Sequence, residues 1–471
     1  MRRVNWIKRF APLDAGSVLE AVYETERWVD QYRHEEEEAS RWEVLPGKEP
    51  DGPLLLSDTG IYAGAAGVAL FYLRLYIADK NEKWLLRAKE GISYVIRKYR
   101  GVEDFHSDSE FLPGAEVGYL NSPAGGAYVA TRLYEVTKEE KYRDFAIRVT
   151  KDCIRAGKEE EGTLTWYGCY GIIGEGSLIL FFLDMYRTYQ EEEFLQAAKK
   201  AALYIVNQKE ETPWGGARWN AMPTEHFPTI GKPGGYFPGF EYGAAGCGFI
   251  LASVYEYTKE EIFLRTAMEA AEYILNLADY SEDKEAALVR YNDTYLTDLY
   301  YLGVCQGPVG TSRLFYKLFE LTGKDEYRNF IEQLTRGILS TGAPAKHSEG
   351  YWRTNCYCCG APGMLENFIN IHKLTGKKEY LDAAYEAAEA IIGESTHQDL
   401  LRNWYTQWNR HEPESSLAYT GLYHGSLGCA SSLLFFSQYL SGKDYITPYL
   451  EDPYKDLFIS NRPDRSRTER R

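Results

Sequence analysis

The sequence predicts an all-α protein, an α/α toroid of seven helical hairpins arranged as an inner and an outer ring of helices. Three observations lead to this prediction. A short glycine motif, G-x-x-G or a close variant, returns seven times. Each copy precedes an apolar stretch with helical periodicity, a polar break and a further helical stretch. The copies stand about 50 to 70 residues apart, enough for two helices and a loop. The seven glycine motifs are Gly64–Gly67, Ser122–Gly125, Gly171–Gly174, Gly243–Gly246, Gly307–Gly310, Gly360–Gly363 and Gly425–Gly428.

The two helices expected in each unit differ in their apolar pattern. The first, as in 178–185 or 248–255, is apolar on most faces, which is typical of a helix buried all round. The second carries alanines at close intervals and a single apolar face, as in 195–205, 263–274 and 380–391. Concentric rings bury the first kind of helix, so closure is favoured over an open solenoid. No stretch shows a convincing strand alternation.

Turn residues mark the boundaries of these helices. A similar stretch with a threonine at the expected turn between two helices occurs four times. We expect these threonines to be N-caps of the second helices: Thr137, Thr258, Thr322 and Thr375. The motif glycines allow tight turns where the first helices converge. Pro308 and Pro362 fall in the first helical turn, where proline is tolerated.

The domain organisation follows from the repeat. Repeated units that share one core form one domain. We expect residues 1–54 to be an N-terminal segment that packs on the ring, with a helix over 15–33 and a loop from Glu35. Residues 55–445 form the toroid, and residues 446–471 form a C-terminal extension.

Composition excludes several classes of function. The net charge of −16 disfavours nucleic acid as a partner. No window approaches the roughly 18 to 20 apolar residues of a membrane span, and the basic stretch 1–10 lacks the apolar core of a secretory signal. We therefore expect a cytoplasmic protein whose eight cysteines are thiols or metal ligands.

The side chains just before each motif are expected to face the centre of the ring at one end. Among them Cys305, Cys358 and Cys359 come from neighbouring units, so their sulfurs should meet. Three thiolates suit zinc, which binds sulfur at about 2.3 Å in tetrahedral geometry, and three protein ligands leave one position open, as in catalytic sites. Alternatives are buried packing thiols, Cys356 in place of one ligand, and a Cys358–Cys359 disulfide. We expect the other four cysteines to pack as small apolar residues: Cys153, Cys169, Cys247 and Cys429.

These motifs resemble the lanthionine synthetase C-like (LanC-like) family over about residues 55–445. The resemblance rests on the seven motifs, the cysteine before the fifth, and Cys-Cys-Gly-Ala-Pro-Gly at the sixth, where the family usually has Cys-His-Gly. It implies a zinc ion held by Cys305, Cys358 and Cys359. It also implies addition of a thiol to dehydroalanine or dehydrobutyrine in a dehydrated peptide, giving a thioether. The thiol is a peptide cysteine or a small thiol such as glutathione. Because the 471 residues contain no dehydratase or kinase region, we expect the protein to resemble the stand-alone type.

The chain departs from the cyclases of this family at two places. Tyr242 stands where they carry a histidine before the fourth motif, and the stretch 166–170 lacks their aspartate. The candidates for acid–base work are therefore His424, Glu241 and Tyr242, which occupy ring positions flanking the cysteines. Histidine handles protons near neutral pH, and a tyrosine hydroxyl stabilises a developing enolate oxygen.

Two other functions compete with this interpretation. One is a zinc-bearing protein that binds a thiol, glutathione or a peptide without turnover, which the missing acid–base pair favours. The other is a carbohydrate-active toroid, which needs paired carboxylates, whereas Glu241 is the lone acid at these positions. Residues in two loops are further candidates for contact with a substrate: His347 and Glu349 before the sixth motif, and Trp404, Trp408, Asn409 and Arg410 before the seventh.

Overall fold

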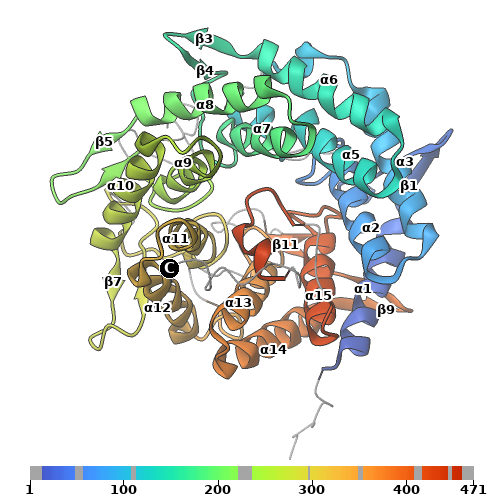
Figure 1. Cartoon of the computed structure of the whole chain (residues 1–471). Helices are drawn as coiled ribbons and strands as arrows, with labels where there is room; N and C mark the ends of the chain where they lie inside the picture. Colours follow the sequence, from blue (N-terminus) through green and yellow to red (C-terminus); the bar gives the residue numbers. More distant parts are fainter. Residues whose placement is uncertain are drawn as a thin grey trace, which may run out of the picture.

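The computed structural model places two concentric rings of helices around one axis (Figure 1). It describes residues 13–47, 57–107, 113–220, 236–294, 297–347, 354–407, 416–443 and 448–458. The chain winds once round the ring, so the last inner helix lies beside the first (Figure 1). This arrangement confirms the predicted α/α toroid. In the described residues, no helix combines the length and the apolar character that crossing a bilayer requires.

The inner ring consists of the helices that follow the glycine motifs. They are α2 (Ala65–Asp79), α5 (Pro123–Thr137), α7 (Gly176–Tyr189), α9 (Ala244–Thr258), α11 (Pro308–Thr322), α13 (Ala361–Thr375) and α15 (Ser426–Leu440). Their apolar character on all faces has the expected consequence, since every residue of α9 from Ala244 to Val254 is buried. Proline occupies the first turn of α11 and of α13, as predicted.

The outer ring covers these helices with amphipathic ones. Six follow their inner partners directly: α3 (Glu82–Lys98), α6 (Glu140–Ala156), α8 (Glu192–Asn207), α10 (Glu261–Leu277), α12 (Asp325–Thr341) and α14 (Lys378–Gly393). The seventh is α1 (Ala15–Asp30), which packs against α15. The N-terminal part of the chain therefore closes the outer ring.

The turns from inner to outer helix differ from the prediction. Thr137 is the last residue of α5, and its hydroxyl donates to the Leu133 carbonyl and accepts from the Glu139 amide. A left-handed residue, Lys138, and the N-cap Glu139 come between it and α6. The same arrangement recurs at Thr258, Thr322 and Thr375. The predicted threonine N-caps are therefore wrong, because reversing the chain needs one left-handed residue after each threonine.

Short antiparallel hairpins, which the sequence analysis did not expect, follow most outer helices. The pairs are β1 (Arg33–Glu36) with β2 (Ala39–Trp42), β3 (Lys158–Glu160) with β4 (Thr163–Thr165), β5 (Glu210–Glu211) with β6 (Ala217–Arg218), β7 (Asp279–Tyr280) with β8 (Ala287–Leu288), β9 (Thr396–Gln398) with β10 (Leu401–Asn403), and β11 (Thr406–Gln407) with β12 (Ser416–Leu417). The loop expected from Glu35 is thus the β1–β2 hairpin. After three of the hairpins a buried tryptophan, Trp166, Trp219 or Trp404, donates its indole N–H to a carbonyl of the preceding outer helix.

Sterics explain the last glycine of each motif. A Cβ on Gly310 would lie 1.9 Å from the carbonyl oxygen of Val304, six residues earlier, and one on Gly246 would lie 1.9 Å from that of Phe240. Only glycine permits an approach this close. In the third unit the equivalent residue is Gly176, against the Tyr170 carbonyl, so this motif is displaced by two residues.

Candidate metal centre

Backbone hydrogen bonds join successive units around the axis at the amino ends of the inner helices, except between the second and third units of the described chain. Six of these bonds join residues that stand before the helices. They run from N–H to carbonyl as Tyr62 to Leu120, Ile173 to Glu241, Glu241 to Cys305, Cys305 to Cys358, Cys358 to Tyr423 and Tyr423 to Tyr62. The residue two places before each motif therefore lies on one circle, as the repeat predicted, except in the third unit. There Ile173 joins the circle, whereas Cys169 packs against Gly114 and Gly174.

The circle brings three sulfurs together. Cys305 Sγ lies 3.2 Å from Cys359 Sγ, which lies 3.3 Å from Cys358 Sγ. The three sulfurs all lie within 4.8 Å of one another. Cys305 and Cys358 are buried, whereas Cys359 is partly exposed. We call these residues the sulfur cluster.

The donor set of the sulfur cluster fits zinc. Two thiolates at about 2.3 Å from a tetrahedral zinc stand roughly 3.8 Å apart, so the sulfurs need to separate by only about half an ångström. Three sulfur ligands with one partly exposed member leave a fourth position for an incoming group. Cys356 lies outside the group of sulfurs that meet the mutual 4.8 Å limit. Both Cys358 and Cys359 are free thiols, so the vicinal disulfide is not formed.

Sharing of protons makes the sulfur cluster one acidic unit. Hydrogen bonds from the Cys358 and Cys359 thiols lower the pKa of Cys305 to about 5. The hydrogen bonds to Cys305 in turn raise the pKa of Cys358 and of Cys359. The lowered pKa of Cys305 favours its thiolate form, the form in which a cysteine binds a metal.

Glu241 and Tyr242 flank the sulfur cluster on the side of the fourth motif. The Cys358 thiol lies 3.4 Å from Glu241 Oε1, and burial, followed by the nearby Cys305 charge, raises the pKa of Glu241. Burial also raises the pKa of Tyr242, with the Tyr291 and Cys305 charges adding to it. The Tyr242 hydroxyl lies 3.2 Å from that of Tyr291.

His424 approaches the sulfur cluster through Cys356. The Cys356 thiol hydrogen-bonds both Cys359 and His424, and the bond to Cys359 is the largest cause that lowers the pKa of Cys356. The imidazole stacks on Tyr62 with ring centroids 6.1 Å apart. All three acid–base candidates therefore lie around the cluster. The sequence analysis missed Cys356 as the connection to His424, although the Cys356-Tyr357-Cys358 spacing was a signal for it.

The structure describes two of the remaining candidates, Trp404 and His347. Trp404 is fully buried and bonded to the Ile391 carbonyl, so the suggestion that it contacts a peptide is wrong. His347 Nε2 lies 3.0 Å from Glu394 Oε1. Glu349, Trp408, Asn409 and Arg410 fall outside the described residues. The four cysteines expected to pack as small apolar residues are all buried.

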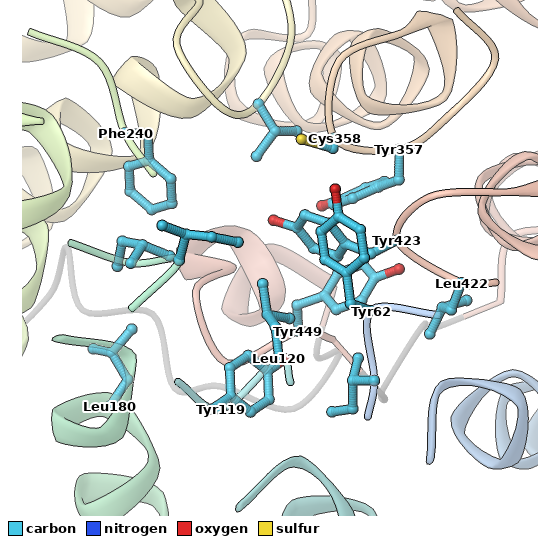
Figure 2. Packing of buried hydrophobic residues seen from close by; sticks show 14 of the residues in the cluster. Tyr62, Tyr119, Leu120, Leu180, Phe240, Tyr357, Cys358, Leu422, Tyr423 and Tyr449 are labelled. Atoms are coloured by element: carbon cyan, nitrogen blue, oxygen red, sulfur yellow. The ribbon is translucent and has the colours of Figure 1, made fainter. Parts of the chain in front are cut away.

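A tyrosine-rich layer lies next to the sulfur cluster, and part of it comes from the C-terminal residues. Figure 2 shows Tyr62, Tyr357, Tyr423 and Tyr449 gathered near Cys358. The Tyr423 hydroxyl donates to Glu451, which is fully buried. Tyr449 and Glu451 lie beyond the last motif, in a segment with no counterpart in the repeat, so no sequence signal placed them here.

Comparisons with known proteins support a common scaffold. Residues 57–450 match the sequence profile of the family described as lanthionine synthetase C-like protein. The structure of nisin cyclase is similar, with a TM-score of 0.55 and 15% sequence identity over 82% of this chain and 94% of that one. A comparison with curated proteins found no match.

Two sugar-active enzymes are more distant. A sugar epimerase from a ruminal bacterium has a TM-score of 0.47 at 12% identity, over 90% of this chain and 98% of its own. A family 76 glycoside hydrolase (mannosidase) from Bacteroides thetaiotaomicron has a TM-score of 0.46 at 13% identity, with the same coverage. Likeness at this level carries no functional argument, whereas the profile match covers most of the sequence. This chain belongs to the lanthionine synthetase C-like family.

Proposed function

We propose that the protein is a zinc-dependent enzyme that adds a thiol to the double bond of a dehydroamino acid in a peptide, forming a thioether. The observation that carries this proposal is the sulfur cluster, in which three sulfurs within 4.8 Å of one another include one partly exposed member. Membership of the family supports the same chemistry. We place the protein in the cytoplasm, because its cysteines are free thiols and a reducing compartment keeps thiols in this form.

In this proposal the cysteines bind the metal and the neighbouring side chains assist the addition. Cys305, Cys358 and Cys359 would hold the metal, which when bound would keep the incoming thiol deprotonated near neutral pH. In the addition, the thiolate sulfur bonds to the β-carbon of the alkene, and the π electrons pass to the α-carbon and its carbonyl as an enolate. A proton must then reach the α-carbon.

In this proposal two side chains would act on the enolate and a third on the sulfur cluster. Tyr242, beside Cys305, would donate a hydrogen bond to the enolate oxygen. His424 would supply the proton, because imidazole exchanges protons near neutral pH. Glu241 would hold the Cys358 sulfur in place through the contact at 3.4 Å.

Incubation of the purified protein with a dehydroalanine-containing peptide and a thiol tests this proposal. Glutathione and a cysteine-containing peptide are the two thiols to compare. We expect thioether formation, measured by mass spectrometry, to exceed the uncatalysed rate and to disappear in Cys305→Ala. Cys169→Ala is the matched control, since that cysteine is buried away from the cluster. A wild-type rate no faster than the uncatalysed one, or an undiminished rate in Cys305→Ala, contradicts the proposal.

A second candidate is a zinc-bearing member of the family that binds a thiol, glutathione or a peptide without turnover. The presence of Tyr242 before the fourth motif and the absence of a carboxylate in 166–170 favour it. Saturable binding of the thiol that depends on Cys305, with no excess rate of addition, would support this candidate over the enzyme.

A further inference from the structure

Residues 448–458 lie inside the ring, where they contact α11 and the tyrosines next to the sulfur cluster. Tyr449 and Tyr454 are 2% exposed and Glu451 is fully buried. The Tyr449 ring packs against Tyr357 and Tyr423, with centroids 4.6 Å and 5.4 Å away (Figure 2). Tyr454 donates to Ser312 of α11. The segment is thus anchored by the inner helices, and its Tyr449 contacts the tyrosine-rich layer next to the sulfur cluster.

Glu451 makes polar contacts with two of its neighbours. Its Oε1 accepts a hydrogen bond of 3.1 Å from the Tyr423 hydroxyl and lies 3.8 Å from the Arg313 guanidinium. Arg313 also donates to the backbone carbonyl of Glu451 and to the Tyr357 hydroxyl. The other carboxylate oxygen, Oε2, is buried without a hydrogen-bond partner among the described residues.

Tyr423 connects Glu451 to the sulfur cluster. Its backbone joins Cys358 to Tyr62 on the hydrogen-bonded circle. Its hydroxyl also faces the Glu241 carboxyl, where it opposes the rise in the pKa of Glu241, and Glu241 Oε1 contacts Cys358 Sγ. Polar contacts therefore run without interruption from Glu451 through Tyr423 and Glu241 to the sulfur of Cys358.

We infer that the C-terminal segment is a working part of the metal site, with Glu451 as a positioning residue that holds Tyr423, and through it Glu241, against Cys358. A purely structural role explains this side chain poorly. A buried carboxylate with an unpartnered oxygen costs stability, and an apolar side chain of similar volume would fill the space at lower cost. Buried polar residues are often retained in proteins because they hydrogen-bond a metal ligand and orient it. The inference rests on the proposed metal site but not on turnover.

The test compares zinc affinity among variants, measured by competition with a chromophoric chelator. We expect Glu451→Ala and Tyr423→Phe each to weaken zinc binding about tenfold, the lower end of the effect of outer-shell partners. The double variant should be no weaker than either single one, because both act through one line of contacts. Glu451→Gln should restore most of the affinity, since its amide oxygen still accepts from Tyr423. Tyr454→Phe, which removes the bond to Ser312 in the same segment, is the matched control and should leave affinity unchanged.

A second readout uses the metal-free protein, in which the alkylation rate of Cys358 by iodoacetamide is followed by peptide mass spectrometry. We expect alkylation to be severalfold faster in Glu451→Ala and in Tyr423→Phe than in the wild type or in Tyr454→Phe. Unchanged affinity and alkylation in a folded Tyr423→Phe, or multiplying effects in the double variant, would overturn the inference. A wild type that binds zinc but does not catalyse addition would refute the enzyme and leave this result standing. A wild type that binds no zinc would overturn the inference together with the metal site, whatever the alkylation rates.

Discussion

The two ends of the ring differ in what fills them. At the amino ends of the inner helices the centre holds sulfur, and Cys359 is partly exposed. Towards the carboxyl ends the centre holds buried ionisable side chains, which are Arg74, Arg313 and Glu366 of the inner helices and Glu451 of the C-terminal segment. A cavity of about 370 Å³ remains there, lined by charged residues that include Arg132, Asp184, Glu256, Lys317, Asp452 and Lys455.

The connections at the two ends account for this difference. At the carboxyl ends, inner and outer helices are joined by only two residues, as between α5 and α6, and the turn repeats almost unchanged. At the amino ends the connections are long, such as 278–307 between α10 and α11. Long connections tolerate variation, so this end can carry different chemistry on a constant scaffold. We therefore expect damage at the carboxyl-end layer to affect mainly folding, except at Glu451, which contacts Tyr423. Damage at the cluster should affect function.

The largest effect on stability should come from removing Arg313. This guanidinium is 4% exposed and pairs with Glu451 and Tyr357. Arg313→Met leaves a buried carboxylate without its cation, which costs about 3–5 kcal/mol of unfolding free energy. Chemical denaturation measures the loss. Arg143→Met, which breaks an exposed pair with Glu140, should cost less than about 1 kcal/mol. Equal losses in the two variants would contradict the claim that the buried charges of this layer, and not exposed pairs, stabilise the fold.

A somewhat smaller effect depends on pH and involves Glu366 of α13. Burial raises the pKa of this carboxyl to about 7, with Asp452 adding to the shift and Arg74 and Arg313 opposing it. Because the folded protein holds this proton more tightly than the unfolded chain, Glu366 stabilises the fold below its unfolded pKa of about 4.5. That contribution is lost as the pH rises towards 7.

Glu366→Gln should therefore be more stable than the wild type above pH 7, by on the order of 3 kcal/mol. The amide oxygen still accepts from Ser432, whose hydroxyl donates to Glu366 in the wild type. The two proteins should converge near pH 4. Denaturation at a series of pH values gives the difference between them. A difference that is constant with pH would mean that Glu366 does not titrate in this range.

The smallest of the three effects belongs to the amino end. A Cβ on Gly310 would meet the Val304 carbonyl at 1.9 Å and Phe240 at 2.6 Å, so Gly310→Ala forces the backbone beside Cys305 to move. We expect a loss of about 1–3 kcal/mol, with weaker zinc binding. Gly393→Ala is the control, because nothing lies within 4 Å of its Cβ. It should be neutral or stabilising by up to about 1 kcal/mol. Unchanged stability and zinc binding in Gly310→Ala would contradict the close approach.

Much of the fold follows from the sequence because its main constraint repeats. Six of the seven motifs end in a glycine that lies against a carbonyl six residues earlier, so these glycines mark the starts of the inner helices. The same repeat placed Cys305 and Cys358 on the circle. It misplaced Cys169, because the third motif is displaced by two residues relative to its helix.

Other features had no local signal. The pairing of α1 with α15 joins opposite ends of the chain. Strands of two to four residues are too short to show an alternating pattern. The threonine turns depend on a left-handed residue, which a lysine provides at Lys138. Glu451 is one acid in a segment without a repeat, and only the packed structure brings it to Tyr423.

Zinc K-edge X-ray absorption on the purified protein tests the central claim most directly. We predict one zinc per chain with three sulfur ligands at about 2.3 Å and one lighter atom completing the tetrahedron. The sulfur count should fall in Cys358→Ala and stay at three in Cys247→Ala. A fourth sulfur, which Cys356 would supply, would indicate a closed structural site, and a chain without bound zinc would contradict the account altogether.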